Sequence, residues 1–325
     1  MMPKILHTAR YTGTPWDILR SVVPENFTVE TLEELNYDSL LRQCEDADYL
    51  LVSGRLPIDE GVLSAAKHLK MIQRTGVGTE MLDMEAIKRH GIPAYVNKGV
   101  NARSVAEHTL TLMLCCLKNI PQIDSQVKQG IWKKQQTGLT CNEMFGKTVG
   151  MVGMGAIGRR VAAYLKVLGA KVIYTDLFRL SEEQETGHAL TYVPTFEDML
   201  PHVDILSFHC PLTKDNQEML NVETIKKMKD GAVVVNTARG KLIEPNALYD
   251  ALKSGKLRSA ALDVHYEEPI KGEYPLSQLN NVILTPHIGG LSYEAFHSMM
   301  EAAIENIQLY EQGNSDSISK MILDR

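Results

Sequence analysis

An arginine, a carboxylate and a histidine each follow a short apolar run that predicts a strand. They are Arg239, Glu268 and His287. The carboxyl ends of parallel strands meet at one edge of a sheet, and ligands bind beyond this edge in open α/β proteins. We therefore expect these three side chains to lie close together there.

This combination of side chains suits hydride transfer to or from a small 2-keto acid. Arg239 can bind a substrate carboxylate through two charge-assisted hydrogen bonds. His287 can protonate the forming alkoxide, or take the hydroxyl proton in the reverse direction, because imidazole titrates near pH ~6.5. Glu268 can bind the second ring nitrogen, which fixes the tautomer and favours the charged ring. Taken singly, each residue also fits an ordinary interpretation: a solvated arginine, an acidic loop and a turn histidine.

A glycine-rich segment indicates a dinucleotide site. Gly153, Gly155 and Gly158 form a G-x-G-x-x-G pattern that follows an apolar run and opens an amphipathic helix, and Asp176 lies 18 residues after Gly158. In this pattern the first glycine allows a tight turn, the second lets a pyrophosphate approach the backbone, and the third lets the helix pack closely. The amino end of the helix then offers N–H groups to the phosphates.

Asp176 bears on the choice of cofactor. A carboxylate at the end of the second strand can accept hydrogen bonds from the ribose hydroxyls and repels a 2′-phosphate. The sequence therefore predicts NAD rather than NADP, although Arg179 lies close enough to weaken that preference. A cap or turn role is the ordinary alternative for Asp176.

The elements that must position these residues alternate between short β-branched runs and helical periodicity, which is typical of parallel α/β sheets. The second part of the chain predicts six strands, at residues 148–152, 171–175, 205–209, 232–236, 259–264 and 282–284. Helices are predicted between them, for example at 157–168, 222–229 and 246–253. Six strands match the count of a dinucleotide-binding sheet.

The first part of the chain shows the same alternation on a smaller scale. Five strands are predicted at residues 4–7, 28–31, 49–53, 71–74 and 94–96, with a helix such as 82–90 between strands. A helix over 104–118, interrupted at Pro121, leads into the second part, and a helix over 293–310 follows it. We expect two doubly wound parallel-sheet domains, in which a Rossmann NAD-binding domain (104–290) is inserted into a discontinuous flavodoxin-like substrate domain (1–103 and 291–325).

Composition narrows the possible partners. The net charge is −6, which argues against a general nucleic-acid or anionic membrane surface. The five cysteines form no C-x-x-C pair and no zinc-type spacing, so we expect no metal, free thiols and a reducing compartment. No apolar run reaches the ~18 residues that a membrane span requires. The sequence predicts a soluble cytoplasmic protein.

The chain resembles the D-isomer-specific 2-hydroxyacid dehydrogenases over most of its length. The resemblance is carried by segments in one order, namely 74–78 (RTGVG), 101–108 (NARSVAEH), 146–150 (GKTVG) before the glycine pattern, 209–213 (HCPLT), 236–240 (NTARG), 261–264 (ALDV), 268–269 (EP) and 285–290 (TPHIGG). It implies catalytic roles for Arg239, Glu268 and His287. It also implies a homodimer, with the helix at 104–118 in the interface.

The resemblance implies further contacts in the site. The backbone at Val77 and Gly78 would face the substrate carboxylate, together with Arg239 and His287. Asp263 would lie near the nicotinamide. The remaining expected cofactor contacts are Val77, Ala156, Ile157, Cys210, Thr237, Ala238, Arg239, His287 and Gly290, beside the three glycines and Asp176.

The substrate stays open at this stage. The resemblance is compatible with 3-phosphoglycerate, glycerate or hydroxypyruvate, glyoxylate and lactate, whereas Glu268 argues against formate because formate-oxidising relatives carry glutamine there. Two alternative functions share the fold: an NADH-sensing binding protein of the co-repressor kind, and a phosphite dehydrogenase.

Overall fold

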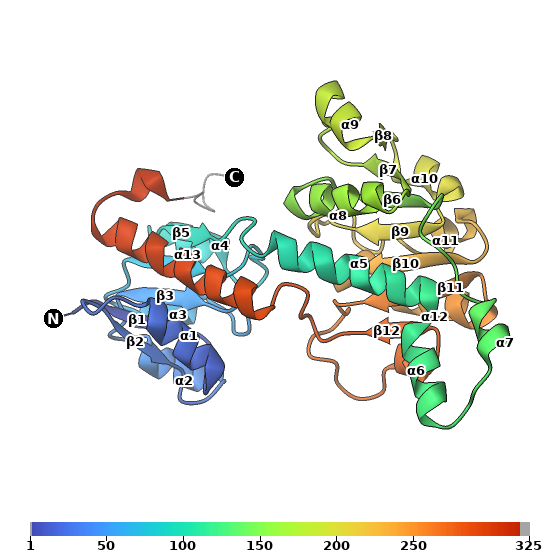
Figure 1. Ribbon diagram of the computed structural model, residues 1–325. Coiled ribbons are helices and arrows are strands. Elements are labelled where there is room, and N and C mark those ends of the chain that lie inside the picture. Colours follow the sequence, from blue (N-terminus) through green and yellow to red (C-terminus); the bar gives the residue numbers. More distant parts are fainter. Residues whose placement is uncertain (1, 319–325) are drawn as a thin grey trace. The chain divides into compact units, whose positions relative to one another are not determined.

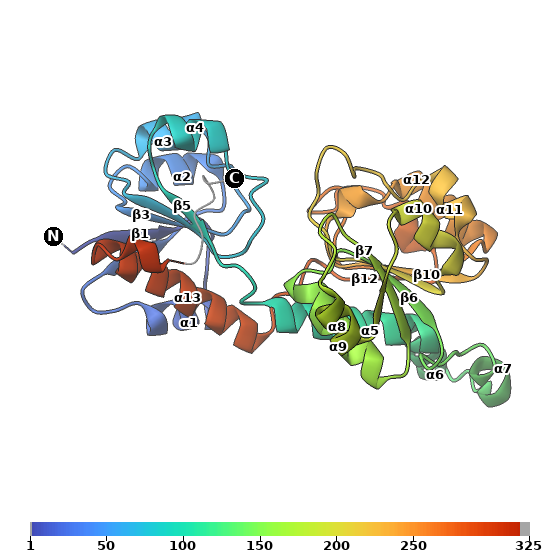
Figure 2. The ribbon, with the colours of Figure 1, turned by 90° about the horizontal axis from the view of Figure 1, so that it is seen from above.

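The computed structural model describes residues 2–318, which divide into two units. Unit 1 contains the residues up to 101 and those from 291 onward, and unit 2 contains Ala102–Gly290. Each unit has its own parallel sheet with helices on both faces (Figures 1 and 2). Met1 and residues 319–325, which the sequence assigns to the substrate domain, lie outside the described residues.

Unit 1 has the strand order β2-β1-β3-β4-β5, which is the flavodoxin-like order. Its strands are β1 (Lys4–His7), β2 (Thr28–Thr31), β3 (Tyr49–Val52), β4 (Met71–Arg74) and β5 (Ala94–Val96). Its helices are α1 (Thr14–Val22), α2 (Tyr37–Gln43), α3 (Glu60–Ala65), α4 (Met84–Arg89) and α13 (Tyr293–Glu311). The five predicted strands are present, and β3 ends one residue before the predicted boundary.

Alternation along the strands of unit 1 produces two apolar cores. Tyr49 and Leu51 of β3 pack with α1 and the returning helix α13, whereas Leu50 and Val52 pack on the opposite face with α2, α3 and α4. This is the pattern of a strand buried on both faces. The returning helix therefore completes the core of unit 1, although it lies almost 200 residues beyond β5 in sequence.

Unit 2 has the strand order β12-β11-β10-β9-β6-β7-β8. Its strands are β6 (Thr148–Val152), β7 (Lys171–Thr175), β8 (Leu190–Tyr192), β9 (Ile205–Phe208), β10 (Ala232–Asn236), β11 (Leu257–Leu262) and β12 (Val282–Leu284). Its α-helices are α5 (Ala102–Lys118), α6 (Ile120–Lys128), α7 (Lys134–Gly138), α8 (Ala156–Val167), α9 (Glu182–His188), α10 (Phe196–Met199), α11 (Val222–Lys227) and α12 (Pro245–Ser254). The order from β8 through β6 to β11 is the Rossmann order 3-2-1-4-5-6, with β12 added at the far edge. The predicted fold class is confirmed.

Two sequence predictions about unit 2 need correction. The described sheet has seven strands rather than six, because β8 was missed. Strand β11 runs over Leu257–Leu262 rather than 259–264, and Leu257 pairs with Ala232 across an irregularity in register. Asp263 therefore lies just beyond the strand, where its side chain can turn toward the loops.

The interruption predicted near Pro121 is present. Asn119 adopts a left-handed conformation with φ 52°, which ends α5, and α6 begins at once with a proline in its first turn. None of the described helices has the length and apolar character needed to cross a membrane.

A buried amide network attaches the returning helix to the sheet of unit 1. The Asn97 amide nitrogen donates to the carbonyl oxygens of Met299 (2.8 Å) and Thr75 (3.2 Å), and its oxygen accepts from Gln73 (3.1 Å). Asn306 of α13 donates to the oxygen of Gln73 (3.2 Å). Since buried polar groups are costly when unpaired, this network specifies how α13 packs.

We expect Asn97→Ala to destabilise unit 1 by about 2 kcal/mol, because it removes the buried hydrogen bonds that join Asn97 to Gln73, Thr75 and Met299. Thermal or urea unfolding followed by circular dichroism measures the change. Asn314→Ala, at an exposed position just after α13, is the matched control and should leave the unfolding midpoint unchanged. Equal midpoints for the two variants would contradict the role of the network.

Candidate active site

The three predicted catalytic residues follow three adjacent strands of unit 2. Arg239, Glu268 and His287 lie after β10, β11 and β12, which pair side by side in the parallel sheet. Their side chains therefore emerge at the same carboxyl edge. The three strand ends thus bring Arg239, Glu268 and His287 to one edge of the sheet.

His287 and Glu268 form a close pair. The Nδ1 atom of His287 lies 2.6 Å from Oε2 of Glu268. The hydrogen bond to Glu268 raises the pKa of His287 above its ordinary value, and it outweighs the opposing effect of burial. Burial alone would raise the pKa of Glu268, but hydrogen bonds from His287 and from the backbone N–H of His265 lower it. The pair is therefore suited to hold a protonated imidazole beside an ionised carboxylate.

The loop that carries His287 is held by the buried carboxylate of Asp263. The Oδ1 atom accepts from the Thr285 hydroxyl (2.6 Å) and the Ile288 N–H (3.0 Å), and Oδ2 accepts from the Gly289 N–H (2.8 Å). The His287 N–H donates to the Asp263 carbonyl oxygen at 2.8 Å. Burial alone would raise the pKa of Asp263, but its contact with His108 and these donors lower it, so the group stays ionised.

The backbone of His287 is unusual. It has φ 57°, in the left-handed region that is uncommon for residues other than glycine, although asparagine, aspartate and histidine adopt it more often than the rest. Such a conformation persists when the surrounding hydrogen bonds specify it. The Asp263 contacts on both sides of His287 supply that specification, and they aim the imidazole at Glu268.

Arg239 lies in a turn that is tied to the end of β10. The buried side chain of Asn236 accepts from the Ala238 N–H (3.0 Å) and donates to the Arg239 carbonyl oxygen (2.8 Å). The Arg239 Nη1 atom donates to the Ala238 carbonyl oxygen at 2.7 Å. The positive charge of Arg239 lowers the pKa of His287, although less than Glu268 raises it, so the two side chains are within electrostatic range.

Close backbone contact joins the arginine turn to the loop after β11. A Cβ atom at Gly240 would lie 2.0 Å from the carbonyl oxygen of His265. Only glycine fits at this distance, since real Cβ contacts are never so short. The lack of a side chain at Gly240 therefore lets the turn that carries Arg239 pack directly against the loop that carries Glu268.

The glycine-rich turn fits a dinucleotide. Gly153 has φ 99°, and a Cβ atom there would lie 2.8 Å from the backbone of Cys210, while a Cβ at Gly158 would lie 2.5 Å from the carbonyl oxygen of Gly153. Gly155 differs, because no heavy atom beyond those of its chain neighbours lies within 4 Å of a Cβ atom built there. Gly155 and Ala156 are exposed at the start of α8, and no described side chain caps this helix. Such a helix start is suited to hold the pyrophosphate of NAD.

Asp176 lies beside this turn. Its Oδ2 atom accepts from the Met154 N–H (2.6 Å) and its Oδ1 atom accepts from the Phe178 N–H (3.1 Å). The carboxylate therefore connects the end of β7 to the glycine turn, which is where the ribose of a bound dinucleotide would lie.

The remaining predicted contacts fall into two groups. Those in unit 2 lie at or near the carboxyl ends of its strands, or at the start of α8, and they are Ala156, Ile157, Cys210, Thr237, Ala238, Asp263 and Gly290. Thr237 is attached to α5, because its hydroxyl lies 2.8 Å from that of Thr109. Val77 and Gly78 belong to unit 1, in the bend after β4. Their role toward a substrate stays a prediction.

Sequence reasoning missed two histidines that support this site. His108 of α5 lies 3.1 Å from the Thr285 hydroxyl and 3.4 Å from Asp263. His265 lies 2.9 Å from the Thr285 carbonyl oxygen and 3.1 Å from the hydroxyl of Tyr274. His265 comes two residues after Asp263 in the segment DVHYEEP, so its closeness to two predicted site residues could have indicated it. For His108, only its position in the segment VAEH could have done so.

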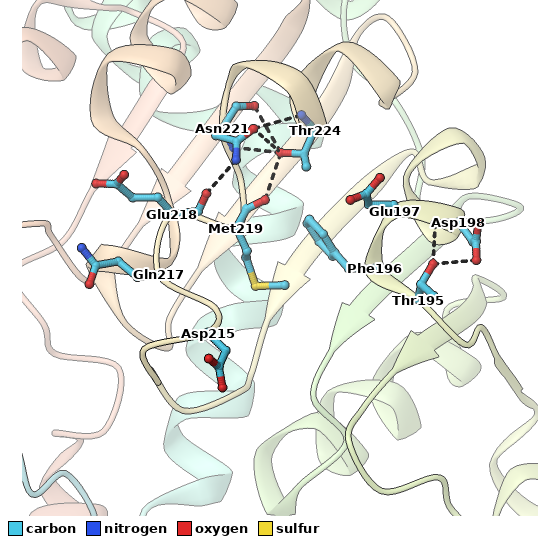
Figure 3. Close-up of a pocket in the computed structure, with 10 residues that line it drawn as sticks. All are labelled: Thr195, Phe196, Glu197, Asp198, Asp215, Gln217, Glu218, Met219, Asn221 and Thr224. Atoms are coloured by element: carbon cyan, nitrogen blue, oxygen red, sulfur yellow. Dashed lines mark hydrogen bonds between the residues drawn. The ribbon is translucent and has the colours of Figure 1, made fainter.

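An open pocket of about 620 Å³ elsewhere in unit 2 has a different character (Figure 3). Its lining includes the carboxylates of Glu197, Asp198, Asp215 and Glu218, and none of the three predicted catalytic residues. Carboxylates repel a keto acid and a pyrophosphate, so we do not assign the reaction to this pocket. No cluster of side chains able to hold a metal ion is present in the described part of the chain.

Comparison with known proteins finds relatives that match most of the chain. The sequence model of the NAD-binding domain of D-isomer specific 2-hydroxyacid dehydrogenases matches residues 110–289. A hydroxypyruvate reductase from Thermotoga maritima is 37% identical over 279 residues, which make up 85% of this chain and 89% of the relative. A D-3-phosphoglycerate dehydrogenase from Archaeoglobus fulgidus is 37% identical over 268 residues, or 82% of this chain. The matched region is 50% of that relative, so the chain spans about half its length.

The fold is shared with solved structures of the same kind. D-lactate dehydrogenase from Aquifex aeolicus, solved in complex with NAD and lactic acid, matches with a TM-score of 0.84 at 25% identity. The match covers 98% of this chain and 99% of that one. The glycine turn, Asp176 and the three strand-end residues all lie inside the matched NAD-binding domain.

The contact with Glu268 predicts how His287 titrates. Glu268→Gln removes the negative charge at Nδ1, so the pKa of His287 should fall, while Asp263 still raises it and Arg239 still lowers it. Proton NMR of the ring Cε1–H over pH 4–9 measures this, with His287→Gln to assign the signal. A pKa raised on folding stabilises the fold fully below the unfolded value (~6.5), and this stabilisation is lost as pH rises through the folded value. An unchanged titration in Glu268→Gln would contradict the assignment.

Proposed function

This chain belongs to the D-isomer-specific 2-hydroxyacid dehydrogenase family, and on that premise we propose that it transfers a hydride between NAD and a small 2-keto or 2-hydroxy acid. The observation that carries the proposal is the 2.6 Å contact between His287 Nδ1 and Glu268 Oε2. Arg239 follows β10, which pairs directly with the strand that precedes Glu268. The bound cofactor would supply the hydride as NADH during reduction and accept it as NAD⁺ during oxidation.

The side chains divide the remaining work among them. Arg239 binds the substrate carboxylate through its planar guanidinium, which orients the reacting carbon. His287 donates a proton from Nε2 to the carbonyl oxygen during reduction, and takes it from the hydroxyl during oxidation. Glu268 binds Nδ1, so that Nε2 faces the substrate and the imidazolium is stabilised.

The cofactor site follows from the glycine turn. The N–H groups at the start of α8 bind the pyrophosphate, and the carboxylate of Asp176 accepts hydrogen bonds from the ribose hydroxyls. We also propose that the backbone of Val77 and Gly78 in unit 1 binds the substrate carboxylate. The five cysteines are free thiols, which is typical of a reducing compartment. We therefore propose that the protein acts in the cytoplasm.

The names of the relatives bear on the substrate class. The relatives are named as a hydroxypyruvate reductase, D-3-phosphoglycerate dehydrogenases and glyoxylate reductases. We propose a 2-keto acid of two to three carbons, or the matching 2-hydroxy acid, with or without a phosphate. The substrates in these names share a carboxylate beside a carbonyl or hydroxyl carbon. Glu268 in place of glutamine argues against formate.

The proposal is tested by following NADH oxidation with hydroxypyruvate, 3-phosphohydroxypyruvate, glyoxylate and pyruvate. His287→Gln should lower kcat by about 10²–10⁴-fold, because glutamine cannot transfer a proton. The pyrophosphate and ribose contacts that bind NADH should stay in place. Arg239→Ala should raise KM for the keto acid and also lower kcat, because the carboxylate loses its ligand. A protein that binds NADH but turns over none of these acids would support a binding function. NADH formation from phosphite would indicate phosphite oxidation.

We also propose a homodimer formed through α5, α6 and α7. None of the side chains of α6 is buried, and Trp132 (78% exposed) and Leu139 (88% exposed) flank α7. Large apolar side chains gathered on one segment mark an interaction surface.

Trp132→Asp combined with Leu139→Asp should convert the dimer to a monomer, measured by sedimentation velocity. Val167→Asp places the same charge on an equally exposed apolar residue at the end of α8, and should leave the dimer intact. A monomeric wild-type protein at micromolar concentration would refute the dimer.

A further inference from the structure

An arginine follows the proposed ribose ligand on the same loop. Arg179 comes three residues after Asp176, on the loop that joins β7 to α9. In Rossmann domains an arginine near this position accommodates the 2′-phosphate of NADP. Asp176 and Arg179 therefore favour different cofactors, because the carboxylate favours NAD and the guanidinium favours NADP.

The structure shows where this guanidinium is bound. The Arg179 Nε atom donates to Oε1 of Glu185 (2.9 Å), and Nη2 donates to Oε2 (2.8 Å). Two parallel bonds between a guanidinium and a carboxylate form the strongest and most directional kind of ion pair. The guanidinium also lies over the ring of Tyr192, 5.1 Å from its centroid.

The partner carboxylate is itself held firmly. Glu185 of α9 is 8% exposed, and its Oε1 atom accepts from the hydroxyl of Tyr174 at 2.7 Å. The Tyr174 hydroxyl in turn accepts from the Leu180 N–H at 2.9 Å. Bonds from Arg179 and Tyr174 lower the pKa of Glu185 to about 2, so it is ionised at neutral pH. Strand β7, helix α9 and strand β8, adjacent in Figure 1, each contribute one member to this cluster.

We propose that Glu185 is a specificity-determining residue, which binds Arg179 and so withholds its guanidinium from a 2′-phosphate. The proposal rests on the NAD site proposed above. The loop carries both a group that rejects NADP and a group able to bind it, and the ion pair with Glu185 removes the second from competition. Preference for NAD then depends on two carboxylates, of which only Asp176 faces the cofactor.

Binding measurements test the proposal without turnover. NADH, NADPH, 5′-AMP and 2′,5′-ADP are titrated into each variant by calorimetry. Asp176→Ser alone should gain little affinity for NADPH, because Arg179 stays bound to Glu185. Asp176→Ser with Glu185→Gln should bind NADPH and 2′,5′-ADP about tenfold or more tightly than Asp176→Ser, since a charge-assisted hydrogen bond to the phosphate becomes available. Glutamine keeps an acceptor for the Tyr174 hydroxyl.

Two controls separate this effect from a general change of charge. Glu183→Gln in the Asp176→Ser background removes an exposed carboxylate from the same helix and should give no gain. Adding Arg179→Gln to the double variant should abolish the gain. A double variant that binds no more tightly than its Glu183 control, or a gain that survives the loss of Arg179, overturns the proposal.

A further variant decides the question if Glu185→Gln does not fold. Phe178 is 82% exposed on the same loop, so Asp176→Ser with Phe178→Arg adds a guanidinium while the Arg179–Glu185 pair stays intact. Affinity for NADPH should rise here as well, and absence of a gain overturns the proposal. Failure of the wild-type protein to bind NADH and 5′-AMP would instead remove the NAD site itself.

Discussion

The buried carboxylate of Asp263 is the interaction on which the proposed site depends most. A buried charge is tolerated only when hydrogen bonds replace its hydration. Here the donors come from the loop that carries His287: the Thr285 hydroxyl and the N–H groups of Ile288 and Gly289. The carboxylate thus cannot be satisfied unless the loop is folded, and the folded loop places His287 against Glu268. The same hydrogen bonds therefore stabilise the buried charge of Asp263 and position His287 beside Glu268.

This constraint extends into α5, whose first half lies behind the reacting groups. His108 contacts Thr285 and Asp263, and Thr109 contacts Thr237 of the arginine turn. The helix that begins unit 2 therefore supports two of the three loops at the carboxyl edge. A single rigid element behind both loops limits how far Arg239 and His287 can move apart, which matters because misplacement by about 1 Å can cost 10²-fold in rate.

Much of this arrangement is predictable from sequence, and the omissions have physical reasons. Parallel strands buried on both faces have strong apolar runs, such as 232–236, so most strands of both sheets were predicted within one or two residues. Strand β8 (Leu190–Tyr192) was missed because only its first residue is buried and its central residue is an exposed threonine at the edge of the sheet. Strand ends also predicted the location of Arg239, Glu268 and His287. The bonds of Asp263 to residues 22 to 26 positions away could not be predicted, because no local pattern encodes them.

The arginines show most clearly what the spacing of residues leaves undetermined. Arg74, Arg179 and Arg239 each lie at or just after the end of a parallel strand, where a guanidinium is expected to meet an anionic ligand. Arg74 donates to the carbonyl oxygens of Val52 and Gly78, which joins the end of β3 to the loop after β4. Arg179 is bound by the carboxylate of Glu185, and Arg239 is oriented by the carbonyl oxygen of Ala238. Residue type and position are thus shared by the three, whereas function depends on which acceptors the fold brings to each guanidinium. Glu185 lies only six residues from Arg179, yet spacing alone does not show that its carboxylate neutralises that guanidinium. This pairing depends on how the loop between β7 and α9 folds.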